Sequence, residues 1–371
     1  MIPQFGKHSY RPSRWRPKAI AAVFAVCAFI TFTRLFRPSF HVFHHTQLYT
    51  FDRGPMSPTK FTGQTPTVPE SPIPRKVWQN YFGDEIDDAS LQDASSWIIL
   101  NRDYRYTLIG RDGAGSFVNR SFANDPALVR RYHSLPNFGM MSDLLRYMVL
   151  YVEGGTYTDI DTTALQPIDH WVAPEQRETV RAIIGLEFDQ RDGSPWADIS
   201  HEVQFCQWTL AAAPGHPLFG RMIARALWSF AELERVHNDT ALARLHPTNF
   251  EVLNSTGPAA FTDVVFDYLR DNNPGLVTHL RNFSYMTEPK LYGDVLILPI
   301  DGFGIGQVHS NSSSGKPPYP ANALVKHNFR GGWRTSEKER EEAEKKQLEA
   351  DERERKDAWK AAAAAAQEAS H

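Results

Sequence analysis

In residues 138–161, patterns typical of a helix, a glycine pair, a short strand and two carboxylates follow one another directly. Apolar residues recur at helical spacing over 138–152, and Ser142 is a possible N-cap. Gly154 and Gly155 come next, and such a pair can end a helix in the left-handed backbone geometry. The segment therefore predicts a helix followed directly by a strand.

Helix and strand patterns alternate along the rest of the chain. This alternation predicts an α/β fold with a mostly parallel central sheet. Ligands of such sheets bind beyond the carboxyl ends of the strands, where the strand order reverses, and residues 151–161 would form one such end. The expected strands cover 104–109, 182–188 and 295–300, and the expected helices cover 201–213, 218–233 and 261–269.

Asp159 and Asp161 form a D-x-D motif after the β-rich run. If the strand continues through them, alternation puts both side chains on one side, with their Cα atoms about 7 Å apart. Two carboxylates so placed can bind one hard cation, Mn²⁺ or Mg²⁺, that keeps positions open for phosphate oxygens. The alternative is a pair of solvated loop carboxylates.

Asp143 and Arg146 lie three residues apart, on one face of the predicted helix. One interpretation is a surface ion pair, which contributes little to stability. The other is a binding role, in which Asp143 accepts hydrogen bonds from a sugar hydroxyl and Arg146 faces phosphate oxygens. Taken alone, the two residues favour the surface ion pair.

Three motifs together resemble glycosyltransferase family 32. The central one joins Ser142-Asp-Leu-Leu-Arg-Tyr to Gly154-Gly-Thr-Tyr-Thr-Asp-Ile-Asp. Residues 73–81 are similar to the family's opening strand, and residues 326–334 to its closing histidine-to-tryptophan motif. Within the family, the chain looks most like the fungal Golgi initiation-type α-1,6-mannosyltransferases. A second glycine at Gly332 departs from the expected Gly-Ser pair.

The resemblance implies a GT-A type nucleotide-sugar-binding fold and a retaining mannosyltransferase. Its donor would be GDP-mannose, and its acceptor an oligomannose N-glycan core on glycoproteins, extended through an α-1,6 bond that initiates the outer chain. Mn²⁺, or Mg²⁺, would be bound by Asp159, Asp161 and His327, with His309 as a weaker candidate. The expected donor-binding residues are Trp78, Asp143, Arg146, Tyr157 and Trp333. Glu187 and Asp189, near a strand end, could contact the acceptor.

Other functions remain open at this point. A related transferase could mannosylate inositol phosphoceramide, although such enzymes usually carry more membrane spans near the C-terminus. The chain could also be a non-catalytic subunit of a mannosyltransferase complex, which the intact D-x-D disfavours. A metal phosphoesterase fits less well, because the His/Asp clusters of two-metal hydrolases are missing.

The N-terminal region predicts a membrane anchor. Basic residues precede an apolar run at 19–33, a pattern typical of an uncleaved signal anchor with its N-terminus in the cytoplasm; a cleaved signal peptide is the alternative. The resemblance places such a single-pass type II protein in the Golgi membrane. We expect a cytoplasmic tail at 1–18, a transmembrane helix at 19–36, a Pro/Thr/Ser-rich stem at 37–72, a lumenal catalytic domain at 73–334 and a charged tail at 335–371.

The composition favours a lumenal domain that is stabilised by its hydrophobic core and not by disulfides. The net charge of −3 indicates no nucleic-acid partner. N-glycosylation sequons begin at Asn119, Asn238, Asn254, Asn282 and Asn311. Only Cys206 lies outside the apolar run that holds Cys27, so no disulfide can form within the domain and the fold must depend on its hydrophobic core.

Overall fold

A computed structural model describes residues 49–51, 71–196, 199–238 and 240–330. The predicted anchor at 19–36, the charged tail at 335–371 and Trp333 lie outside these ranges, as does most of the predicted stem. Among the helices that the structure describes, none combines the length and the apolar character needed to cross a bilayer.

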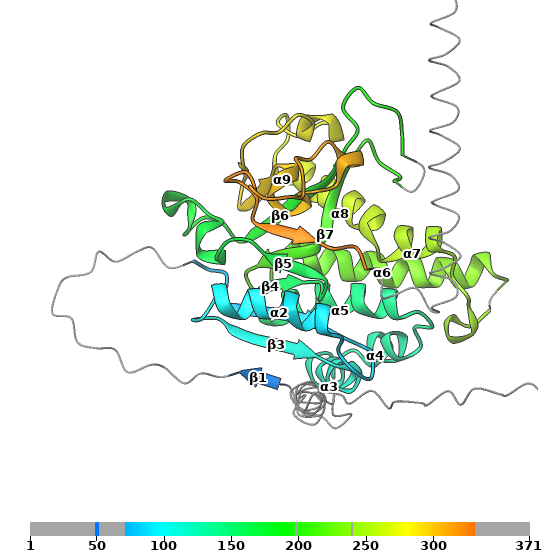
Figure 1. Ribbon diagram of the computed structural model, residues 1–371. Helices are drawn as coiled ribbons and strands as arrows, with labels where there is room; N and C mark the ends of the chain where they lie inside the picture. Colours follow the sequence, from blue (N-terminus) through cyan, green and yellow to red (C-terminus); the bar gives the residue numbers. More distant parts are fainter. Residues whose placement is uncertain (1–48, 52–70, 197–198, 239, 331–371) are drawn as a thin grey trace, which may run out of the picture. The chain divides into compact units, whose positions relative to one another are not determined.

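The centre of the molecule is one mixed sheet with the strand order β1-β3-β2-β4-β7-β6-β9-β8 (Figure 1). Strands β2, β3, β4, β6 and β9 run in one direction, whereas β1, β7 and β8 run against them. The predicted α/β class with a mostly parallel sheet is confirmed. The strands are β1 Tyr49–Phe51, β2 Lys76–Asn80, β3 Arg105–Ile109, β4 Gly155–Thr158, β6 Ala182–Asp189, β7 Val203–Ala212, β8 Lys290–Tyr292 and β9 Val295–Leu298.

A hydrophobic core covers each face of this sheet. Successive residues of β6 alternate between the cores, since Ile184 packs with α5, α6 and α8 and Ile183 packs with residues of α2 and α9. Burial on both faces explains why the central strands read as nearly continuous apolar runs. The helices are α2 Asp88–Leu100, α3 Arg111–Ser121, α4 Pro126–His133, α5 Phe138–Glu153, α6 Pro217–Val236, α7 Asn249–Ser255, α8 Pro258–Asn272 and α9 Ile300–Gly304, with short 3₁₀ turns at Ile168–His170, Pro174–Gln176, Leu242–Arg244, Leu280–Phe283 and Val308–Ser310.

The helix predicted at 201–213 is wrong, because this segment forms strand β7. The strand lies between β4 and β6, and every one of its residues is buried. A short run buried on both faces lacks the two-residue alternation of a half-exposed strand, so periodicity cannot separate it from a buried helix. Its valine, phenylalanine, tryptophan and threonine, which favour strands, were the signal that could have decided.

Helix α5 ends where the glycine pair predicted. Gly154 (φ 63°) and Gly155 (φ 102°) both have left-handed backbones. A Cβ atom at Gly154 would lie 2.8 Å from the Ala212 carbonyl oxygen, so only glycine lets β4 follow the helix at this distance. The helix starts earlier than predicted: the N-cap is Asn137, whose side chain accepts a hydrogen bond of 2.7 Å from the Gly139 amide, and Ser142 lies within the helix.

A second, two-stranded sheet joins distant parts of the chain. Strand β5, Thr162–Ala164, follows the D-x-D motif, and β10, Val325–His327, pairs with it in antiparallel register. In Figure 1 the orange strand β10 lies beside the green strand β5. This pairing places His327 opposite Thr162 and therefore next to the aspartates.

Candidate metal centre

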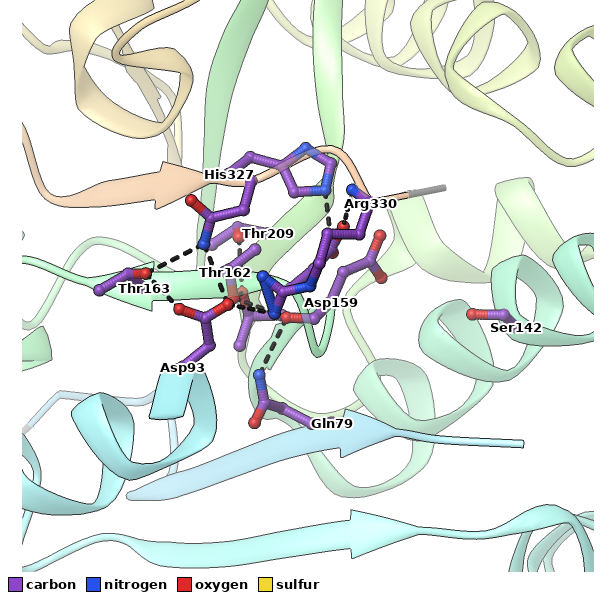
Figure 2. Close-up of polar contacts among 12 residues, drawn as sticks. Gln79, Asp93, Ser142, Asp159, Thr162, Thr163, Thr209, His327 and Arg330 are labelled. Carbon is purple, nitrogen blue, oxygen red and sulfur yellow. Dashed lines mark hydrogen bonds and ion pairs between the residues drawn. The ribbon is translucent and has the colours of Figure 1, made fainter. Parts of the chain in front are cut away.

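Both aspartates lie in a tight turn beyond the carboxyl end of β4. The strand ends at Thr158, and the amide and hydroxyl of Thr162 donate hydrogen bonds of 3.2 and 2.6 Å to the Asp159 carbonyl oxygen. The Gln79 side chain donates to the same oxygen at 2.9 Å (Figure 2). The prediction that the strand continues through both aspartates is therefore wrong. The turn, and not strand alternation, brings the two carboxylates together.

The turn and strand β10 assemble a possible metal site. One ligand atom from each of Asp159, Asp161 and His327 lies within 4.8 Å of the other two. Nε2 of His327 is 3.0 Å from Oδ1 of Asp161, and its ring stacks on Trp208 with centroids 4.4 Å apart. Nδ1 of His327 is buried without a hydrogen-bond partner. Two carboxylates with an imidazole fit Mn²⁺ or Mg²⁺, and Nε2 of His327, which faces Asp161, is the ring nitrogen placed to join them as a ligand. His309 instead stacks on Trp196, with centroids 5.0 Å apart.

Arg146 connects helix α5 to the turn. Its Nη2 atom is 2.9 Å from Oδ1 of Asp159 and its Nη1 atom is 3.1 Å from Oδ1 of Asp143. Only 4% of the Arg146 side chain and 7% of the Asp143 side chain are exposed, so the surface ion-pair interpretation is wrong. The same guanidinium also donates to Oε1 of Gln207 on β7.

The two carboxyl groups of the turn have different electrostatic surroundings. Burial raises the pKa of Asp159 above its ordinary value, although Arg146 opposes the rise. Burial also acts on Asp161, but there the charge and hydrogen bond of His327, with a backbone N–H bond from Arg330, outweigh it and lower the pKa to about 2. Asp161 is therefore fully ionised at neutral pH.

Three of the predicted donor-binding residues, Asp143, Arg146 and Tyr157, lie close together but are largely occupied within the protein. The Asp143 carboxylate accepts hydrogen bonds from Gln207 at 3.1 Å and Thr256 at 2.8 Å. The Tyr157 hydroxyl donates to Oδ1 of Asp159 at 2.8 Å, which orients that carboxylate. Direct contact of Asp143, Arg146 and Tyr157 with a donor stays a prediction.

Trp78 is buried and contributes to the packing of the fold. Its exposed fraction is 7%, and its indole N–H donates to the Gly154 carbonyl oxygen at 2.9 Å. The side chain thus ties β2 to the glycine pair. This burial argues against the predicted contact of Trp78 with the donor.

Several residues around the centre escaped the sequence analysis. Gln207 and Trp208 lie on β7, which the sequence suggested was a helix, and Asp93 belongs to no motif. Arg330 lies within the closing motif, but the sequence predicted no role for it. Glu187, at the end of β6, accepts a hydrogen bond of 3.1 Å from Gln204. Burial raises the pKa of Glu187, although the hydrogen bond from Gln204 and the charge of His327 partly oppose the rise.

The same turn is part of a known protein family. Residues 88–178, which include the D-x-D motif, match the family described as the glycosyltransferase sugar-binding region containing a DXD motif. This segment of the chain therefore resembles that family's sugar-binding region. The resemblance noted from the three motifs is thereby confirmed.

Curated proteins similar to this chain carry related names. It is 34% identical over 267 residues to the initiation-specific α-1,6-mannosyltransferase of Schizosaccharomyces pombe, a match that covers 71% of this chain and 64% of the relative. It is 29% identical over 295 residues to the enzyme of that name in Candida albicans, covering 73% and 74%. Inositol phosphoceramide mannosyltransferase 3 of S. pombe is 29% identical over 127 residues, covering only 33% and 35%. The chain thus spans just under two thirds of the length of the first of these relatives.

Proposed function

We propose that this chain is a metal-dependent, retaining mannosyltransferase that transfers mannose from GDP-mannose to an N-glycan core through an α-1,6 bond. The observation that carries the proposal is the group of Asp159, Asp161 and His327 at the carboxyl end of β4, with the guanidinium of Arg146 bonded to Asp159. The names of the relatives that match 71% and 73% of the chain support the same activity. The fold would be of the GT-A type.

Some residues of the chain would bind the metal, and others orient those ligands. Bound Mn²⁺, or Mg²⁺, would offset the negative charge of the departing nucleoside diphosphate. Arg146 and Tyr157 hold the Asp159 carboxylate in place, and Asp161 remains ionised because its pKa is about 2. The bond from the sugar C1 to phosphate breaks as the acceptor hydroxyl oxygen bonds to C1. The proton of that hydroxyl passes to the departing phosphate, so no separate protein base is required.

The test is a transfer assay with purified full-length protein. GDP-mannose, other nucleotide sugars, Mn²⁺ and an oligomannose acceptor are combined, and products are measured by mass spectrometry. We expect a single added mannose, from GDP-mannose alone, and linkage analysis should find an α-1,6 bond. A folded protein that is inactive with every nucleotide sugar would contradict the proposal, and transfer of another sugar would contradict the donor.

Inositol phosphoceramide as the acceptor is the second candidate. It is supported by one relative that matches only a third of the chain, and we favour the glycan for that reason. Including the lipid in the acceptor panel separates the two. A non-catalytic subunit of a mannosyltransferase complex would bind nucleotide sugar weakly or not at all and would give no product alone.

The cellular arrangement is part of the proposal. A type II Golgi membrane protein with residues 19–36 as its anchor would hold the catalytic domain in the lumen. Protease protection of intact Golgi vesicles should leave the domain uncut until detergent is added. Digestion of the domain in intact vesicles would contradict the orientation.

A further inference from the structure

The segment 325–330, which we call the closing segment, makes its polar contacts to the metal centre through Asp161. His327 faces Oδ1 of Asp161 at 3.0 Å, and the Arg330 amide donates to Oδ2 at 2.8 Å. The Asn328 amide donates to the Asp161 carbonyl oxygen at 2.9 Å. The segment therefore supplies one predicted metal ligand and orients another.

A single carboxylate outside the metal centre holds this segment. Asp93 on α2 forms an ion pair with Arg330 and accepts a hydrogen bond of 3.0 Å from the Asn328 side chain. Its other oxygen accepts a hydrogen bond of 2.6 Å from Thr163 on β5. Figure 2 shows Asp93 beneath the closing segment, with dashed lines to Thr163 and to the segment. Asp93 thus joins β5, and the residues that follow β10, to α2.

The backbone of the closing segment needs such support. Phe329 has a φ of 47°, a left-handed conformation that is strained for a residue with a Cβ atom and persists only where its surroundings impose it. The turn at Phe329 lies between His327 and Arg330, so it sets how the imidazole and the Arg330 amide both reach Asp161. Contacts on each side of Phe329, from Asn328 and Arg330 to Asp93, hold the turn in place.

The burial of Asp93 suggests a specific role. Only 9% of its side chain is exposed, and a buried carboxylate is costly unless its partners satisfy it. All of the partners named above belong to the closing segment or to the strand that pairs with it. Asp93 is not in the group of possible metal ligands.

We propose that Asp93 is a positioning residue that pins the closing segment onto the D-x-D turn and thereby sets the metal affinity of the site. The proposal rests on the metal centre of the proposed function, but not on the identity of the sugar or the acceptor. Outer partners of metal ligands typically change metal affinity by about 10- to 100-fold when removed, because the ligands lose their fixed orientation.

The test measures Mn²⁺ binding directly, by isothermal titration calorimetry and by the electron paramagnetic resonance signal of free Mn²⁺. Full-length wild type, Asp93→Asn, Arg330→Met and the double variant are compared at one pH. Each single variant should bind Mn²⁺ about 10- to 100-fold more weakly. The double variant should be no weaker than the weaker single, because both changes remove the same link. Arg330→Lys, which keeps the charge, should recover part of the affinity.

Asp271→Asn is the matched control. Asp271 pairs with Arg221 at 2.7 Å on the helical surface, where both side chains are about half exposed, and its loss should leave Mn²⁺ affinity unchanged. If Asp93→Asn does not fold, Arg330→Met carries the test, since a third of that side chain is exposed.

The possible failures are distinguishable. Wild-type affinity in folded Asp93→Asn or Arg330→Met would overturn the positioning role and leave the metal centre standing. Fully additive losses in the double variant would overturn the link through Arg330. If wild type itself binds no Mn²⁺, the metal centre fails and the positioning role fails with it.

Discussion

Two ion pairs of nearly equal length differ in where they lie. At the metal centre, Arg146 and Asp159 are 2.9 Å apart, with 4% and 24% of their side chains exposed. On the surface of α6 and α8, Arg221 and Asp271 are 2.7 Å apart, with 44% and 48% exposed. Exposed pairs typically contribute about 0–1 kcal/mol, whereas removing one partner of a buried pair costs about 3–5 kcal/mol. Burial, and not distance, decides how much each pair contributes to stability.

The buried pair also belongs to a network that joins three elements of the fold. Arg146 reaches Asp143, Asp159 and Gln207, and thus joins α5, the D-x-D turn and β7. Apolar residues of similar volume would often be as stable as a buried ionic network. Its presence at the carboxyl end of β4 is best explained by the ligands that it orients.

The largest expected difference between the two regions concerns the metal. Asp161→Asn should lower mannosyl transfer by more than about 100-fold, because an anionic ligand and the partner of His327 are lost. Removal of metal by EDTA should have the same effect in wild type, and added Mn²⁺ should reverse it. At 100 times its Kd, Mn²⁺ should also stabilise wild type by about 2.7 kcal/mol, measured as a shift in thermal unfolding. Asp271→Asn should match wild type in both assays, and retained turnover in Asp161→Asn would remove its assigned role.

The next effect concerns stability. Arg146→Met should lower the free energy of unfolding by about 3–5 kcal/mol, because it leaves Asp143 and Asp159 buried without their cation. Arg221→Met, the matched change at the surface, should lower it by no more than about 1 kcal/mol. Urea unfolding, followed by tryptophan fluorescence, measures both values. Equal losses in the two variants would end the distinction between the regions.

The smallest effect tests whether burial acts in the same way within the helical layer. Burial lowers the pKa of His216, the N-cap of α6, although Asp294 opposes the change. As the pH falls below about 6.5, the ordinary histidine value, the unfolded chain takes up a proton that folded His216 does not. The free energy of unfolding should then fall, by at most about 1.4 kcal/mol per pH unit from this residue, until the lowered folded pKa is reached.

Paired unfolding curves for wild type and His216→Gln measure this contribution. The variant should lose less stability than wild type between pH 7 and pH 5.5. Parallel pH profiles would show that the burial of His216 has no such consequence.

Local patterns determined much of the architecture. The helix ending at Gly154 was predictable, because apolar spacing and a left-handed glycine need only near neighbours in the chain. The strands at 182–188 and 295–300 and the helices around 218–233 and 261–269 followed for the same reason, and β6, β9, α6 and α8 confirm them. Strand β7 did not follow, because burial on both faces is a property of its neighbours in the sheet.

The candidate site likewise has features that the sequence determined and features that only the tertiary structure decided. The sequence by itself determined that two carboxylates follow a strand, and the family motifs pointed to His327. Only the tertiary structure decided that Asp159 and Asp161 meet in a turn and that His327, 166 residues from Asp161, reaches it through the pairing of β5 with β10. Asp93 belongs to no motif, because its function comes entirely from contacts with residues 70 or more positions away. Such long-range contacts depend on the whole core being folded, so no local pattern could have indicated them.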